Sequence, residues 1–344
     1  MSKSEKMLPL SHQKASITIM INIEHIFTLT PESFTEAALQ IFDYQYNHNE
    51  VYRDVAQLLR RTPQQVSSLE QIPFLPVSLF KTHRIQTGEW NPEKIFRSSG
   101  VSGMQTSRHF VKDVALYEKS FTEGFRYFYG NPEDYCFLAL LPSYLEREDS
   151  SLVYMLQTLM AQSRHPDNGF YLYDHLSLNR KLKDLEQKEE KTLLWGVSYA
   201  LLDFSEQYPL SLKNTTVIET GGMKGKRREM IRSELHEILC QRFELQRIHS
   251  EYGMAELFSQ AYSKGGGIFQ IPPWMRIITR EPDDPLTPAK SGRKGGINII
   301  DLANIHSCSF IATQDLGTIF PDGTFEISGR FDNSDLRGCN LMVE

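Results

Sequence analysis

The spacing of apolar residues changes along the chain, from helical near its start to strand-like near its end. Residues 31–60 begin with Pro31 and Glu32 and then place apolar side chains three and four positions apart, which predicts two helices. Residues 72–85 contain two prolines and are expected to be extended or turning, because proline disfavours helical backbone in the residue before it. Helical spacing returns over residues 111–128.

The middle of the chain alternates short apolar runs with helical patterns. The runs that predict strands are residues 135–141, 169–174, the first half of 192–204, and 214–222. The patterns that predict helices are residues 151–163, the second half of 192–204, and 228–243. Strands and helices that alternate in this way predict an α/β fold with a mainly parallel sheet.

From about residue 267 onward, short strands lie between glycine-containing turns, which indicates a β-rich subdomain attached to the α/β body. We therefore expect four regions. They are a helical N-terminal segment packed on the body (1–90), the α/β core (91–266), the β-rich part of the same unit (267–328), and a C-terminal tail (329–344).

Composition and charge exclude some classes of protein. The chain has 37 Lys and Arg against 43 Asp and Glu, a net charge of −6, so nucleic acid is not expected as its main partner. The apolar N-terminal run is interrupted by Glu24 and His25 and is too short to span a membrane, so we expect no membrane span and a cytoplasmic location. Four scattered cysteines without a C-x-x-C pair argue against a compact zinc site and do not support a disulfide scaffold.

A loop of serines and glycines, "SSGVSG", follows residue 97. Backbone N–H groups in such a loop can bind anionic oxygen, and a helix after it would add partial positive charge. The candidate phosphate-binding residues are Ser98, Ser99, Gly100, Ser102 and Gly103. An ordinary surface loop is the alternative, and the two interpretations are about equally supported by the loop alone.

A second glycine turn, Gly221–Gly222, follows a predicted strand, where α/β sheets bind ligands, although a tight strand-to-helix turn explains it as well. Further along, Tyr252 and Glu256 flank Gly253. A carboxylate near bound phosphates commonly holds Mg²⁺, and an aromatic face can stack on a base. The alternative for this stretch is the capped start of a helix with a solvated glutamate.

Acidic and basic residues near the end of the chain are also candidates. Asp315 is expected in a turn after an apolar strand, where it either grips ribose hydroxyls or forms a local Asp-x-Gly turn. Cys339 lies close to Arg337, which could lower its pKa, although cysteine is more often a small buried hydrophobe. The other cysteines are expected in the core or on a helix. Of the histidines, only His109 lies close to a candidate site.

The order of these motifs resembles the adenylate-forming superfamily. Within it, "SSGVSGMQTSRH", "EYGMAELFSQAY", "PPWMRIITREPDDP" and "GRFDNSDLRGCNLM" are most similar to the acyl-protein synthetase (LuxE-type) family. The similarity runs from about residue 60 to the C-terminus. It implies the large domain of an adenylate-forming enzyme, with mainly parallel sheets flanked by helices and a β-rich subdomain.

The resemblance also implies a reaction. Members activate a carboxylic acid with ATP to form an acyl-adenylate, which a thiol then attacks, and a fatty acid is the expected substrate. By motif, Ser98–Gly103 would hold the β- and γ-phosphates, Gly221 and Gly222 the adenine, and Asp315 the ribose. Tyr252 would lie beside the adenine and the acyl carbonyl, and Glu256 would bind Mg²⁺. Arg330 would contact the ribose or the α-phosphate. Cys339 would accept the acyl group before a partner protein receives it.

Two departures from the superfamily pattern shape these expectations. No lysine directly follows the loop, so Arg108 or His109 is expected to contact phosphate instead. The chain ends soon after the hinge-like "GRFDNSD", so we expect the mobile C-terminal domain and its lysine to be absent, with Arg330, Arg337, Mg²⁺ or a partner protein meeting the charge of the α-phosphate. The alternatives are a non-catalytic nucleotide- or acyl-binding subunit and a ligase that forms acyl-CoA.

Overall fold

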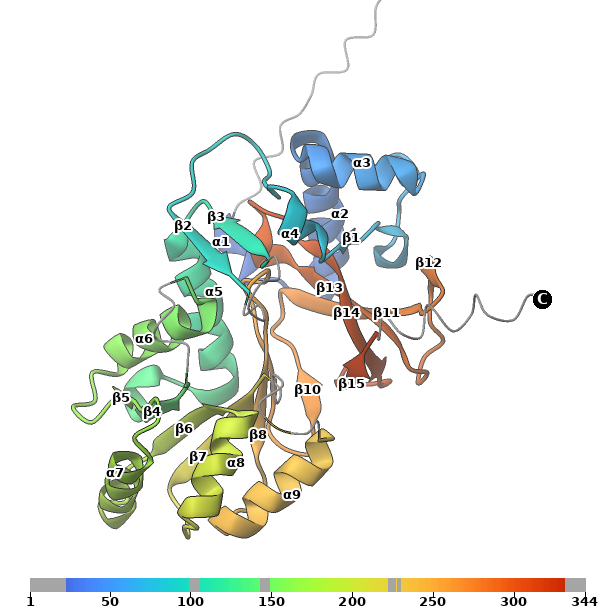
Figure 1. Ribbon diagram of the computed structural model, residues 1–344. Coiled ribbons are helices and arrows are strands. Elements are labelled where there is room, and N and C mark those ends of the chain that lie inside the picture. The colour runs from blue at the N-terminus through green and yellow to red at the C-terminus, as the bar shows by residue number, and fades with distance from the viewer. Residues whose placement is uncertain (1–22, 99–105, 143–148, 222–226, 228–229, 332–344) are drawn as a thin grey trace, which may run out of the picture.

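The computed structural model describes residues 23–98, 106–142, 149–221, 227 and 230–331. Figure 1 shows an α/β part at the lower left and a β-rich part at the upper right, joined through the sheet. No helix within these described residues is long and apolar enough to cross a membrane.

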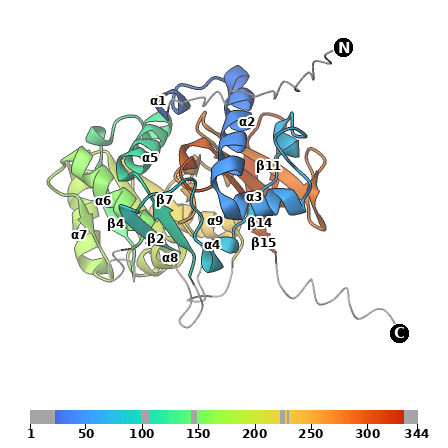
Figure 2. The same cartoon turned by 90° about the horizontal axis from the view of Figure 1, so that it is seen from above.

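The N-terminal helices pack on the β-rich part. They are α1 (Ile23–Ile26), α2 (Pro31–His48), α3 (Glu50–Leu58) and the short η1 (Leu69–Gln71). The two helices expected over residues 31–60 are thus confirmed, and Asn49 separates them because its side chain caps α3. From α2, the buried Gln45 donates to the carbonyls of Asn304 and Ile305. Figure 2 shows α2 lying over the β-rich part.

The segment after α3 is largely extended, as its prolines predict. It contains β1 (Leu75–Pro76), the single-turn α4 (Leu79–Thr82), and a hairpin of β2 (Lys94–Arg97) and β3 (Arg108–Val111). Strand β3 separates the Ser/Gly loop from α5 (Val114–Tyr129), whose N-cap is Asp113. The helix expected over residues 111–128 is confirmed, but β3 lies between it and the loop, and a contribution of its partial positive charge to the loop stays a prediction.

The α/β part has the alternation that the sequence predicts, with one additional helix, α7 (His175–Gln187), which was not predicted. Its elements are η2 (Pro132–Asp134), β4 (Cys136–Leu140), α6 (Ser151–Ser163), β5 (Gly169–Phe170), α7 (His175–Gln187), β6 (Thr192–Val197), α8 (Ser198–Gln207), β7 (Thr215–Thr220), α9 (Arg232–Phe243) and β8 (His249–Tyr252). Strands β5, β4, β6, β7 and β8 pair in parallel. Side chains on one face of this sheet, such as Phe137 and Tyr262, pack on α5, and Gly196 on the other face packs on α8.

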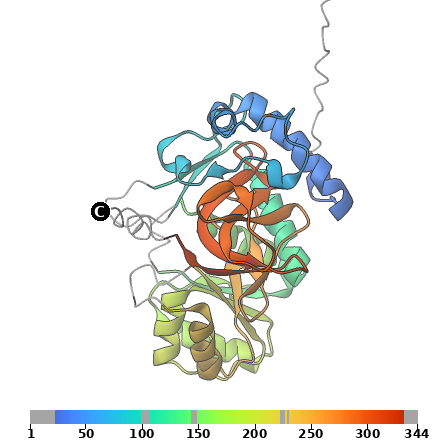
Figure 3. The same ribbon diagram turned by 90° about the vertical axis from the view of Figure 1, so that its right-hand side faces the viewer.

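The β-rich part consists of antiparallel strands. They are β9 (Ala261–Ser263), β10 (Ile268–Gln270), β11 (Met275–Glu281), β12 (Asp284–Pro288), β13 (Gly295–Asp301), β14 (Phe310–Ile319) and β15 (Phe325–Arg330), with η3 (Leu302–Asn304) after β13. The sheet is continuous with the α/β part through β8 and β9, and its far strands curve strongly (Figure 3). Cys136 and Cys308 are buried and Cys240 lies on α9, as expected.

Candidate active site

The predicted site residues fall into two groups. The structure describes Ser98, His109, Gly221, Tyr252, Glu256, Asp315 and Arg330. The predictions for Ser99, Gly100, Ser102, Gly103, Gly222, Arg337 and Cys339 lie outside the described residues.

Three of the predicted residues meet through hydrogen bonds. The hydroxyl of Tyr252 donates to Oδ2 of Asp315 at 2.7 Å, and Nε of Arg330 donates to Oδ1 of the same carboxylate at 2.9 Å. The side chain of Asp315 is 9% exposed and that of Arg330 is 72% exposed, so the carboxylate is anchored while much of the guanidinium stays open to a ligand. Burial and the nearby Asp315 raise the pKa of Tyr252, which keeps its hydroxyl protonated as a donor.

Asp315 does not lie in a turn, so that expectation is wrong. It occupies the middle of β14, directly opposite Arg330 of β15 in the register of the pair. Residues directly opposite one another in an antiparallel pair have neighbouring side chains, which explains the Asp315–Arg330 contact. The alternative of a local Asp-x-Gly turn is excluded by the same strand.

Glu256 is buried rather than solvated. Only 5% of it is exposed, and it lies in a non-helical loop after β8, so the alternative of a helix start with a solvated glutamate is wrong. Burial raises its pKa, and a hydrogen bond with Ser107 opposes that shift. Ser107 also donates its backbone N–H to Oγ of Ser98 at 3.0 Å. Glu256 therefore lies next to the base of the Ser/Gly loop.

Three buried side chains hold the loop that carries Glu256, residues 254–260, and we call them the loop clamp: His109, Asp301 and Asn304. The amide nitrogen of Asn304 donates to the Glu256 carbonyl at 2.8 Å. Oδ2 of Asp301 accepts from the backbone N–H groups of Phe258 and Ser259, both at 2.9 Å. Sequence reasoning missed Asp301 and Asn304, since their role depends on contacts more than forty residues away.

His109 acts behind the loop. Its Nδ1 lies 2.7 Å from the Ala255 carbonyl oxygen and its Nε2 lies 3.0 Å from Oδ1 of Asn304. Burial lowers the pKa of His109 to about 4, although both hydrogen bonds favour the protonated ring. Because both ring nitrogens face protein atoms and the side chain is fully buried, this arrangement contradicts the expectation that His109 contacts phosphate. It is instead a positioning residue for the loop.

Gly221 follows the carboxyl end of β7 and has a φ of 72°, a backbone conformation that favours glycine. Its carbonyl accepts from the hydroxyl of Ser198 at 3.2 Å. The preceding buried Glu219 pairs with Arg232 of α9 at 2.9 Å. Burial alone would raise the pKa of Glu219, but hydrogen bonding to His236 and the charge of Arg232 lower it to about 2. This ion pair fixes the start of the Gly221 turn against α9.

A third buried glutamate, Glu251, was also missed. It points to the opposite face of β8 from Tyr252 and accepts a hydrogen bond from the hydroxyl of Thr220. A Cβ on Gly253 would collide with Oε1 of Glu251, so glycine is required there for the loop to pass over the carboxylate. Nothing in the short polar strand His249–Tyr252 distinguishes this glutamate, because its partner Thr220 lies on the neighbouring strand β7.

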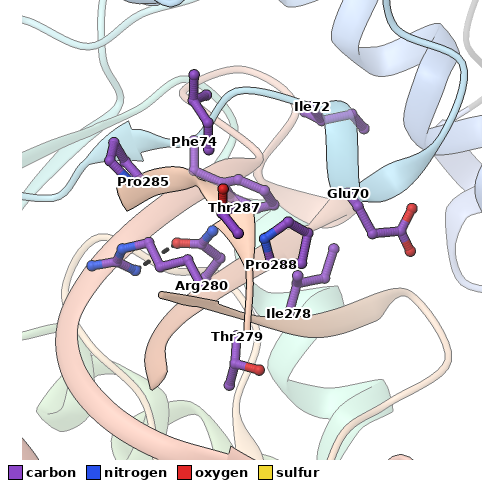
Figure 4. A pocket seen from close by; sticks show the side chains of 11 residues that line it. Glu70, Ile72, Phe74, Ile278, Thr279, Arg280, Pro285, Thr287 and Pro288 are labelled. Atoms are coloured by element: carbon purple, nitrogen blue, oxygen red, sulfur yellow. Dashed lines mark hydrogen bonds between the residues drawn. The ribbon is translucent and has the colours of Figure 1, made fainter. Parts of the chain in front are cut away.

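Two cavities lie away from these residues. The one in Figure 4, between the segment before β1 and strands β11–β13, measures about 10 Å³, and Arg280 beside it donates to Asn298 at 2.6 Å. Such a volume fits about one water molecule. The other, about 300 Å³, is lined by Lys213 and Arg247 at the amino ends of β7 and β8, opposite to the candidate site. Neither cavity belongs to the assembly around Tyr252.

Solved structures share this fold. The structure of ATP-bound MatB from Rhodopseudomonas palustris matches with a TM-score of 0.52 and 16% identity, covering 69% of this chain and 47% of that one. A 2-hydroxyisobutyryl-CoA ligase in the postadenylation state matches with a TM-score of 0.63 and 14% identity, covering 90% of this chain and 70% of that one. The chain therefore shares the fold of these two proteins, and it spans about half the length of the MatB protein.

The comparison with protein families matches a shorter part of the chain but identifies one particular family. Residues 30–137 match the family described as "Acyl-protein synthetase, LuxE", a segment that includes the Ser/Gly loop and ends before Tyr252. The match begins earlier than the expected similarity and confirms the LuxE-type resemblance over residues 60–137, while the resemblance expected from residue 138 to the C-terminus stays a prediction. No curated protein matches the chain.

Proposed function

We propose that this protein uses ATP to convert a carboxylic acid into an acyl-adenylate and then transfers the acyl group to a protein thiol. The observation that carries the proposal is the hydrogen-bonded assembly of Tyr252, Asp315 and Arg330, three motif residues from separate strands. The buried Glu256, next to the base of the Ser/Gly loop, is a fourth motif residue that supports it. The LuxE match of residues 30–137 supports the reaction class.

The reaction needs positioning and charge neutralisation more than acid–base chemistry. A carboxylate oxygen attacks the α-phosphorus, and the bond to pyrophosphate breaks. In our proposal Asp315, held by Tyr252, accepts from ribose hydroxyls, and the exposed part of Arg330 contacts the ribose or the α-phosphate. The Ser98–Gly103 loop would receive the pyrophosphate, and Gly221 would lie against the adenine.

Mg²⁺ fits Glu256. The ion prefers oxygen ligands and is usually held by one or two carboxylates together with substrate phosphates. Burial raises the pKa of Glu256, and a cation beside the carboxylate would favour its ionised form. The described residues contain no group of three or more His, Cys, Asp or Glu that could hold a metal. In this proposal Glu256 would share the ion with ATP, and the ion would neutralise phosphate charge.

Exchange of labelled pyrophosphate into ATP, dependent on added acid, tests the adenylation step. We expect Glu256→Gln to lose the Mg²⁺-dependent exchange by roughly 100-fold or more, in line with loss of a transition-state charge contact. The exposed Glu237→Gln on α9 is the control, and both variants should keep the circular dichroism of the parent. ATP binding without exchange for any acid would refute catalysis and support a nucleotide-binding subunit.

The acyl acceptor is a separate question. The LuxE match favours a protein thiol, and the C-terminal motif suggests Cys339 as the first acceptor, whereas a structurally similar ligase was solved with 2-HIB-AMP and CoA. A labelled acyl group that stays on the protein and is lost in Cys339→Ser would support protein acylation. Release of AMP that depends on CoA and survives Cys339→Ser would instead support an acyl-CoA ligase. The acceptor protein and a cytoplasmic location remain predictions.

A further inference from the structure

Four polar side chains gather at the end of the loop that carries Glu256, and we call them the polar floor: Trp195, Glu251, Gln260 and Tyr262. Glu251 lies directly opposite Tyr262 in the β8–β9 pair, so both point to the same face. Gln260 is the last residue of the Glu256 loop, and its Cγ approaches Gly253 from the same region as Oε1 of Glu251. The rings of Trp195 and Tyr262 are 6.1 Å apart.

Three of these side chains have unused hydrogen-bonding atoms. Among the described residues, Nε1 of Trp195, Oε1 of Gln260 and the hydroxyl of Tyr262 are buried without a partner. Trp195 and Tyr262 are fully buried and Gln260 is 5% exposed. A buried polar group without a partner is destabilising, and such groups are few in native proteins. Their concentration in one place therefore indicates a ligand that supplies the missing partners.

The polar floor adjoins the proposed reaction centre. A Cβ on Gly253 would collide with Oε1 of Glu251 and lie 3.3 Å from Cγ of Gln260, so both side chains border the backbone between Tyr252 and Glu256. On the far side, the rings of Phe128 and Tyr129 lie 5.1 and 5.4 Å from that of Tyr262. These rings pack against Tyr262 itself, which disfavours a long alkyl chain in this direction.

Resting on the function proposed above, we propose that the polar floor binds a hydroxyl or amino group of the acid substrate. The substrate class is then a short polar carboxylic acid rather than an unsubstituted fatty acid. Gln260 and Glu251 offer acceptors to the substrate's donor, Trp195 offers a donor, and the Tyr262 hydroxyl can do either. A site built to bond a polar group discriminates strongly against analogues that lack it, because its own buried groups are then left unpaired.

The test compares four acids in the pyrophosphate-exchange assay: butanoate, 3-hydroxybutanoate, 4-aminobutanoate and tetradecanoate. We expect kcat/KM for one of the two polar acids to exceed that for butanoate and tetradecanoate by about 100-fold or more. A preference for 3-hydroxybutanoate would show that the polar floor binds a hydroxyl group, and a preference for 4-aminobutanoate would show that it binds an amino group. Tyr262→Phe should lower kcat/KM for the preferred acid roughly 10-fold and leave that for butanoate nearly unchanged. Equal or better use of tetradecanoate would overturn the inference while leaving adenylation intact.

A second measurement does not depend on turnover. Tyr262→Phe removes a hydroxyl that has no partner among the described residues, so the free variant should unfold at the same or a higher temperature than the parent. Tyr52→Phe is the matched control, because the buried Tyr52 hydroxyl donates to Pro73 at 2.8 Å and its loss should lower the unfolding temperature. Calorimetric binding of the preferred acid that Tyr262→Phe weakens would support the inference even without exchange. Absence of binding by every acid would overturn it together with the proposed function.

Discussion

Replacing Asp301 by Asn tests whether the loop clamp holds the Glu256 loop. The carboxylate of Asp301 is fully buried and accepts four hydrogen bonds. Two come from the backbone of Phe258 and Ser259, one from the Ser259 hydroxyl at 2.7 Å, and one from the Ala303 N–H at 3.2 Å. The Ser259 oxygen also accepts from Nε1 of Trp274 at 2.9 Å, so its own proton is directed at Asp301.

The expected cost follows from this geometry. An asparagine can keep its oxygen towards the two backbone donors, but its amide nitrogen then faces the Ser259 hydroxyl and the Ala303 N–H. Loss of a bond to a charged group costs about 1.5–3 kcal/mol, and an unpaired buried N–H adds about 1–3 kcal/mol. Burial raises the pKa of Asp301, which means that the charged carboxylate is destabilised by its surroundings. Replacing it by a neutral amide therefore offsets part of the lost free energy. We expect a net loss of about 2–4 kcal/mol in the free energy of unfolding.

Urea denaturation measures this change, and thermal unfolding provides a second reading. With about 2.1 cal/mol/K of unfolding entropy per residue, such a loss lowers the Tm of this 344-residue chain by about 3–6 °C. The control is Asp322→Asn, because Asp322 also accepts from a backbone N–H and a hydroxyl of Thr324 but is exposed. Its expected change is within about 0.5 kcal/mol. If Asp301→Asn changed stability no more than this control, the loop clamp would have no energetic role.

Three further predictions concern the other networks. Tyr252→Phe removes the donor to Asp315 and should raise the KM for ATP about 5- to 10-fold in the exchange assay without unfolding the protein, and an unchanged KM would contradict the role of this bond. Glu219, with a folded-state pKa of about 2, contributes stability that is present above pH 4.5 and lost as the pH falls towards 2, so Glu219→Gln should flatten that part of the pH dependence of the urea midpoint. His109, with a pKa of about 4 against about 6.5 when unfolded, contributes stability that is lost between pH 6.5 and 4, and His109→Gln should reduce this loss in the same measurement.

Local patterns predicted much of the secondary structure but not all of it. The two N-terminal helices, the buried strands and α9 follow from apolar spacing and capping residues close in sequence. Helix α7 was not predicted, although Leu178, Leu182 and Leu185 have helical spacing and are buried. Asp315 was expected in a turn, because Asp and Gly two positions apart favour turns locally. Pairing with β13 and β15 outweighs that preference.

The sequence by itself determined the fold class, the family resemblance and most of the polar groups proposed to face ATP, since these depend on residue type and order within short motifs. Only the tertiary structure decided how those groups are held. It placed Arg330 opposite Asp315, put both nitrogens of His109 behind the Glu256 loop, and made Asp301 an anchor for that loop. It also brought the polar floor together from three strands and the end of the Glu256 loop. The physical reason is that burial and hydrogen-bond partners arise from contacts between distant segments, which residue order does not specify.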